Sequence, residues 1–195
     1  MNTEYNDPWE ILSKEEAAEK NNAVPMDEKI RRSVHELTHH LIAEHYGLPC
    51  EGIELGHMEG HPRIASGLAH TGDYLAQKNA AGEPITLEEN RAYVHAVLSN
   101  GYGDEAIFGT DAGLRGDEID VRRARWHLEG TLGYTKEEAD AFIADSIEQT
   151  RKILADPKIK ENLLKAGKKV ARENWGTGLM SRDAVNDVLN IKKGM

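Results

Sequence analysis

Apolar residues recur at a helical period early in the chain. The spacing of four, three and four residues is that of an amphipathic helix, and it is shown by Ile30, Val34, Leu37 and Leu41. We therefore predict a helix over residues 27–46. Asp27 is its expected N-cap, and Gly47-Leu48-Pro49 is a typical helix end.

Most of the later chain also reads as helical. Thr86 and Thr135 are each followed three residues later by glutamate, the capping-box pattern that begins a helix. Ser181 is a further N-cap, and Pro157 is expected to break a helix. The helices predicted after the first one cover about residues 86–101, 104–108, 117–129, 135–156, 158–175 and 181–189.

Two short β-prone stretches follow the first long helix, at residues 51–55 and 63–69, and a turn-rich segment joins them as a hairpin or as neighbouring strands. The predicted fold class is thus α+β and predominantly helical, with a small β-sheet or hairpin and a C-terminal helical bundle. Residues 1–25 are polar and are expected to form an N-terminal arm with a short helix near 12–20. Residues 26–195 form the main domain, with a helical subregion from about 117.

Composition narrows the classes of partner. The chain has 195 residues and a formal net charge of −10, and an acidic surface disfavours nucleic acid, which needs a dense positive face. The basic clusters, at residues 122–125 and 165–172, have the spacing of solvated helix faces. No apolar run reaches the roughly 20 residues of a membrane span, and no signal peptide is apparent. Cys50 is the only cysteine, which excludes an internal disulfide and fits a cytoplasmic protein.

The candidate metal-binding and catalytic residues lie in the segment His35-Glu36-Leu37-Thr38-His39. Residues four apart on a helix project from the same face, so His35 and His39 can bind one metal ion together. Glu36 has the position of the general base that takes a proton from a metal-activated water in H-E-x-x-H peptidases. The alternative is a histidine-rich helix face that binds no metal. His40 points away from the ligand face and is expected to be exposed.

A catalytic zinc site usually has three protein ligands, so one more is needed. Local spacing leaves the candidates open: they are His57, His61, His70, His95, Asp117, Asp120 and His127. Two histidines and one carboxylate suit Zn²⁺ best, although iron(II) uses the same set.

Four stretches follow one another in a recognisable order: Val34-His35-Glu36-Leu37-Thr38-His39, Gly101-Tyr102-Gly103-Asp104-Glu105-Ala106-Ile107-Phe108-Gly109, Asp120-Val121-Arg122-Arg123-Ala124, and the tail ending in Ser181-Arg182-Asp183-Ala184-Val185. In this order they resemble the peptidase domain of the FtsH-type ATP-dependent zinc metalloproteases, and they span roughly residues 27–190. The resemblance implies a zinc-peptidase-like fold with an active-site helix. It also implies zinc ligation by His35, His39 and Asp120, with Glu36 as the base. The gap after Phe108-Gly109 favours Asp120 over Asp117 as the third ligand.

The sequence departs from the family at Leu37 and Thr38, where the family usually has small residues, and it contains no G-x-x-x-x-G-K-[ST] phosphate loop. It therefore predicts an ATP-independent zinc endopeptidase that cuts peptides or flexible, already unfolded chains. Residues 64–68 or 52–55 are candidates for an edge strand that binds the substrate. The alternatives are a catalytically idle peptidase-like module that holds a protein partner, and a metal-free helical interaction protein. A homo-oligomer is compatible with all three hypotheses.

Overall fold

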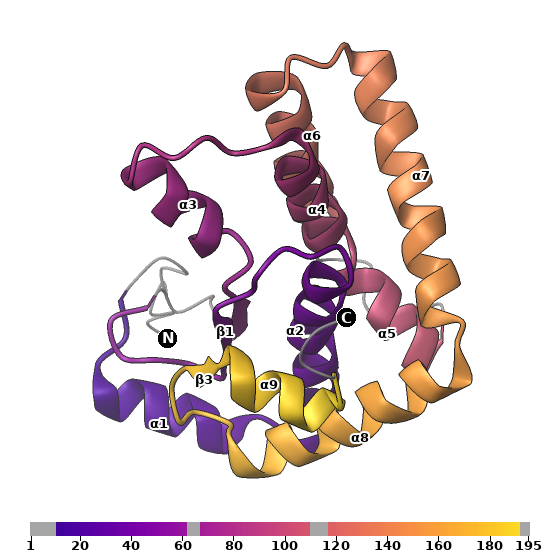
Figure 1. Cartoon of the computed structure of the whole chain (residues 1–195). Helices are drawn as coiled ribbons and strands as arrows, with labels where there is room; N and C mark the ends of the chain where they lie inside the picture. Colours follow the sequence, from indigo (N-terminus) through magenta and orange to yellow (C-terminus); the bar gives the residue numbers. More distant parts are fainter. Residues whose placement is uncertain (1–10, 62–66, 110–116, 192–195) are drawn as a thin grey trace, which may run out of the picture.

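The computed structural model describes residues 11–61, 67–109 and 117–191, except for the side chains of Asn100, Asp117 and Glu118. The α+β prediction is confirmed, because helices predominate and one small sheet is present (Figure 1). The helices are α1 (Lys14–Ala23), α2 (Met26–His45), α3 (Asp73–Ala80), α4 (Leu87–Leu98), α5 (Asn100–Phe108), α6 (Asp117–Trp126), the π-helix η1 (His127–Thr131), α7 (Lys136–Leu154), α8 (Pro157–Glu173) and α9 (Arg182–Leu189). The strands are β1 (Gly52–Leu55), β2 (Gly67–Ala69) and β3 (Met180–Ser181).

Helix α2 runs through the middle of the molecule and contacts α4, α5, α8 and the sheet (Figure 1). Val34 and Leu37, on its apolar stripe, are fully buried in the main core. The predicted N-cap was wrong. Pro25 takes the extended N-cap conformation, and Asp27 lies in the first turn, where its charge favours the helix dipole.

Two glycines bring neighbouring helices close to α2. A Cβ added to Gly167 of α8 would lie 2.6 Å from Val34 Cγ2, and one added to Gly103 of α5 would overlap Thr38 Oγ1. Neither glycine has the positive φ that disfavours other residues, so the lack of a side chain, rather than backbone freedom, is what matters here. The absence of Cβ at these positions lets α5 and α8 pack tightly against the helix that carries the histidines.

The three strands form an antiparallel sheet in the order β2-β1-β3. The predicted pairing of the first two strands is confirmed, with Ile53 opposite Ala69; residues 62–66 lie outside the described part of the chain. Strand β3 has only two residues and was not predicted. Because β1 lies between β2 and β3, the suggestion that residues 52–55 form a substrate-binding edge was wrong. Of the other suggested stretch, 64–68, the described residues lie in β2, at one edge of the sheet.

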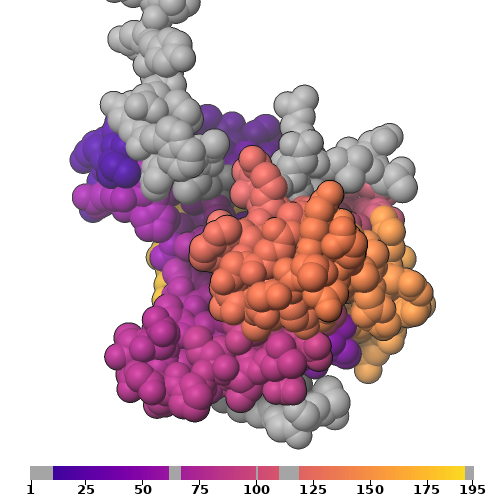
Figure 2. Space-filling view, turned by 90° about the horizontal axis from the view of Figure 1, so that it is seen from above, coloured from indigo at the N-terminus to yellow at the C-terminus, as the bar shows by residue number. Residues whose placement is uncertain are grey.

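A second group of buried residues joins α4, α6 and α7. The Thr86 and Thr135 capping boxes are both present, whereas helix α3 was not predicted. Pro157 begins α8 directly after the N-cap Asp156. Seen from above, the connection between α6 and α7 lies in front, with the α3 region beside it (Figure 2). None of the described helices has both the length and the apolar character that a membrane crossing requires.

His40 corrects a further expectation, because its side chain is fully buried rather than exposed. It does point away from the ligand face, but α9 packs on that side of α2, and His40 Nε2 lies 2.8 Å from Asn186 Oδ1. An amphipathic pattern read from α2 alone does not reveal that a helix from the end of the chain covers its polar side.

The close approach at Gly103 yields a stability prediction. Gly103→Ala should lower the free energy of unfolding by about 1–3 kcal/mol, the usual cost of overpacking, because the new methyl group overlaps Thr38. In a Thr38→Ala background the same substitution should cost less. Urea unfolding of the four proteins measures the coupling. Gly130→Ala is the matched control, since its Cβ would meet only Trp126 at 3.7 Å; equal costs at both glycines would contradict the packing argument.

His95 on α4 is buried between Tyr46, whose ring stacks on it at 4.0 Å, and α7, where Ser146 Oγ lies 2.7 Å from its Nδ1. Burial lowers the pKa of His95 from 6.5 to about 4. The unfolded chain therefore takes up a proton below about pH 6.5, but the folded chain does so only near pH 4. The stabilisation is complete above pH 6.5 and is lost as the pH falls through this window.

We predict that replacing His95 and Ser146 by Phe and Ala flattens this pH dependence. Between pH 7.5 and 4, the free energy of unfolding of the metal-free wild type should fall by ~3 kcal/mol more than that of the double variant. Urea titrations at several pH values measure this difference. Ser146→Ala alone should keep the wild-type slope, and parallel curves for wild type and double variant would disprove the role of His95.

Candidate metal centre

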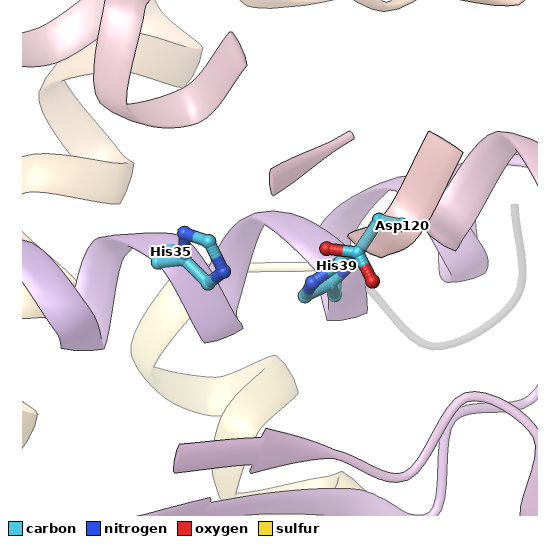
Figure 3. A group of neighbouring side chains, drawn as sticks. All are labelled: His35, His39 and Asp120. Atoms are coloured by element: carbon cyan, nitrogen blue, oxygen red, sulfur yellow. The ribbon is translucent and has the colours of Figure 1, made fainter. Parts of the chain in front are cut away.

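His35 and His39 project from successive turns of α2, and Asp120 comes from α6, which lies across from them (Figure 3). One ligand atom from each of the three lies within 4.8 Å of the other two. In the part of the chain that the structure describes, this is the one group of three or more His, Cys, Asp or Glu side chains that meets this distance. The fold thus brings together the three residues that the sequence predicted as ligands.

His39 has the neutral tautomer that metal binding requires. Its Nδ1 lies 2.7 Å from the carbonyl oxygen of Ala96 on α4. Because a carbonyl oxygen only accepts, Nδ1 carries the proton and Nε2 keeps its lone pair. Burial and the nearby charges of His35 and Arg123 lower the pKa of His39 to about 3, so the ring is neutral at physiological pH.

His35 faces an acidic partner on α5. Its Nδ1 lies 3.7 Å from Asp104 Oδ2, which is beyond hydrogen-bond length but within reach of charge attraction. Burial opposes protonation of His35, yet the contact with Asp104 and the charges of Glu36 and Asp120 outweigh it and raise the pKa above 6.5. A carboxylate behind a ligating histidine is a common arrangement, since it orients the ring and increases its basicity.

Asp120 lies in the first turns of α6, and its side chain is 14% exposed. Arg123, one turn further along the helix, has its Nη1 3.7 Å from Asp120 Oδ1. The side chain of Asp117, the other aspartate considered as the third ligand, lies outside the described part of the structure. Asp120 therefore has the geometry required of the third ligand.

Glu36 is nearly fully buried beside the three residues. The backbone N–H of Ala69 donates to its carboxylate, and a Cβ on Gly67 would lie 2.7 Å from Glu36 Oε1. Strand β2 thus crosses directly over the carboxylate. Burial raises the pKa of Glu36 to about 7, with a further contribution from the charge of Asp120. A cation in the site would favour the charged form and lower this pKa.

The other histidines considered as ligands have different surroundings. His95 contacts Ser146, and His127 Nε2 lies 2.8 Å from Asn90 Oδ1. His61 and His70 each approach Glu54 at 3.8 Å on another part of the sheet. Neither they nor His57 belong to the group at His35.

A cavity of about 200 Å³ opens at the site. The ligand group, Glu36, strand β2 and Arg123 surround it; the lining residues are His35, Glu36, His39, Gly67, Leu68, Ala69, Thr71, Val97, Asp120 and Arg123. Two imidazoles, one of them fixed as a neutral donor, and a carboxylate suit Zn²⁺. The donor set therefore fits a divalent metal ion, with room beside it for a small part of a substrate.

Sequence reasoning missed two supporting groups. Asp104 was noticed only as part of an acidic pair in the Gly101–Gly109 stretch, and its contact with His35 was not expected. The Ala96 carbonyl, which orients His39, has no signal in the sequence because every residue has such a group. Contacts between α2, α4 and α5 place both groups at the site.

Compared with known proteins, the chain matches no protein-family model and no curated protein sequence.

We predict that the ligand group binds one zinc ion per chain and that Asp120→Ala weakens binding by more than about 100-fold, because even changes behind the ligands cost about 10–100-fold. Elemental analysis after zinc loading and dialysis measures the stoichiometry, and competition with a chromogenic chelator measures the affinity. Asp145→Ala, at an exposed position on α7, is the control and should bind like wild type. Equal zinc in both variants, or none in wild type, would rule out this site.

Proposed function

We propose that the chain is a zinc-dependent endopeptidase of the H-E-x-x-H type, which cuts peptides and flexible or unfolded protein segments. The observation that supports this most is the meeting of His35, His39 and Asp120, from two separate helices, beside the buried carboxylate of Glu36. A histidine-rich helix face without metal needs no such partner from α6. The resemblance to the peptidase domain of FtsH-type metalloproteases supports the same function.

His35, His39 and Asp120 would hold the metal. Zinc held there would polarise the scissile carbonyl and make a water molecule more acidic. The protein's own contribution is orientation: Ala96 fixes the ring of His39, and Asp104 faces the outer nitrogen of His35. Groups on α4 and α5 therefore orient the two ligand histidines of α2 before substrate binds.

Glu36 is the proposed general base. Its carboxylate lies beside the ligand group at the cavity, so it can take a proton from the attacking water and pass it to the leaving amine. The Ala69 N–H holds the carboxylate beside the cavity. A metal ion in the site would keep Glu36 in the charged form that accepts the proton.

The free edge of β2 is the proposed substrate-binding strand. The His70 N–H donates to the Gly52 carbonyl, and bonding alternates along an antiparallel pair. In the register of β1 and β2, Leu68 therefore bonds towards β1, whereas the backbone groups of Gly67 and Ala69 point away from it. The Ala69 N–H faces Glu36, so an extended peptide would pair with the backbone groups of Gly67 and with the Ala69 carbonyl, and it would run past Glu36 and the ligand group.

Glu36→Gln tests the mechanism. The variant keeps an oxygen that can accept from Ala69 but cannot take up a proton, so it should bind zinc like wild type while cleavage of an unfolded protein falls by about 10²–10⁴-fold. Product peptides quantified by mass spectrometry, together with zinc content, provide the two readouts. Glu28→Gln, on the same helix and paired with Arg32, is the matched control and should keep full activity.

Two outcomes would contradict the proposal. Full cleavage by the Glu36→Gln variant would show that Glu36 is not the base. A zinc-loaded wild type that binds unfolded proteins but cuts none would favour the idle module that holds a protein partner.

A further inference from the structure

Arg123 lies at the mouth of the candidate metal centre. Its side chain lines the same cavity as Glu36 and the three ligands, and it is 54% exposed. Among the described residues that line this cavity, it provides the one permanent positive charge. That charge acts on the site, since it contributes to the lowered pKa of His39.

The contacts of Arg123 leave its guanidinium available. Within the described part of the chain its closest charged partner is Asp120, at 3.7 Å, a distance too long for a hydrogen bond. An exposed pair three residues apart on a helix contributes only about 0–1 kcal/mol. A planar guanidinium has five N–H donors, and over the residues that the structure describes the contact with Asp120 is the one ion pair of Arg123. Stabilising α6 does not by itself account for an arginine here.

The surroundings indicate what the guanidinium would bind. A divalent ion held by His35, His39 and Asp120 would offset the charges of Asp120 and Glu36, and Arg123 adds a further positive charge at the cavity mouth. A substrate carboxylate beside Arg123 would therefore be attracted, whereas a lysine or arginine there would be repelled. Arginine binds carboxylates through two parallel N–H···O bonds, which fixes their orientation as well as their position.

Exposed apolar side chains lie next to Arg123 on the same face of α6. Ile119, four residues earlier, is 54% exposed, and Trp126, three residues later, is 71% exposed. Leu68 on β2, itself 43% exposed, lines the cavity as well. A peptide that extends from the cavity along this face of α6 would thus meet a basic group with apolar groups on either side.

We propose that Arg123 is a specificity-determining residue that binds an acidic side chain of the substrate close to the scissile bond. This inference rests on the proposed endopeptidase function. It names the substrate class: extended peptide segments with Asp or Glu next to the cleavage site, in preference to segments with Lys or Arg there. Arg123 acts on the substrate, and Asp120 keeps its role as a ligand without it.

The first experiment maps cleavage sites. An unfolded protein is digested by zinc-loaded wild type, Arg123→Gln and Arg123→Glu, and the product ends are read by mass spectrometry. Wild type should cut next to Asp or Glu several-fold more often than chance. Arg123→Gln should lose this preference, and Arg123→Glu should favour Lys or Arg. Arg172→Glu makes the same charge change at an exposed position on α8 and should leave the wild-type pattern intact.

Binding gives a readout that does not depend on cleavage. Two fluorescent unstructured peptides differing in a single Glu or Lys are titrated onto the zinc-loaded Glu36→Gln protein, with and without Arg123→Glu. The Glu peptide should bind about ten-fold more tightly, and the charge reversal should invert the order. Zinc content close to one ion per chain in every Arg123 variant is part of the expected result.

Three results would overturn the inference. Loss of zinc from Arg123→Gln would mean that Arg123 only orients Asp120. An equal fall in kcat for all peptides, with the sequence preference unchanged, would mean that it acts on the reacting carbonyl. If wild type cleaves without preference for sites next to Asp or Glu, the role of Arg123 is disproved, while the proposed peptidase function stands. If no protein is cut but the peptides bind as expected, the peptidase function fails and recognition of acidic segments by Arg123 stands.

Discussion

The burial of helix α2 is the constraint on which the rest of the structure depends. The helix is surrounded by α4, α5, α8, α9 and the sheet, so most of its side chains contact one of these elements. Gly103 and Gly167 allow two of these helices to approach closely. Because the helix cannot rotate without breaking this packing, His35 and His39 are held facing α6 and the cavity. The rigidity of the candidate site is therefore a property of the core rather than of the site itself.

The second determining feature is a cluster of carboxylates around His35. Glu36, Asp104 and Asp120 all lie near His35, and their charges help to raise its pKa. Asp104 Oδ1 is buried without a hydrogen-bond partner in the described structure. Arg31 Nε lies 3.6 Å from Asp104 Oδ2 and Arg123 Nη1 lies 3.7 Å from Asp120 Oδ1, so two arginines offset part of this charge. A divalent ion between His35, His39 and Asp120 would stabilise the crowded carboxylates further.

Leu37 and Thr38, which lie between Glu36 and His39, are accommodated by packing on two sides of α2. Thr38 is fully buried, and its hydroxyl donates to the Val34 carbonyl one turn earlier. The space for its side chain comes from Gly103 on α5. Leu37 is fully buried too, on the side of α2 that faces the main core. In this chain the tight approach between helices depends on a glycine in the neighbouring helix, not on small residues in the motif.

Local patterns along the chain predicted the elements whose cause is local. The apolar period placed α2 to within one residue at each end, the Thr-x-x-Glu patterns identified the starts of α4 and α7, and the spacing of His35 and His39 put both rings on one face. The burial of His40 under α9, the position of Asp104 behind His35 and the approach of Asp120 to within ligand distance follow from the packing of distant segments. Helix periods and caps depend on interactions within a few residues and can be read along the chain. Contacts between distant segments depend on how the helices pack around α2, and no local pattern specifies that arrangement.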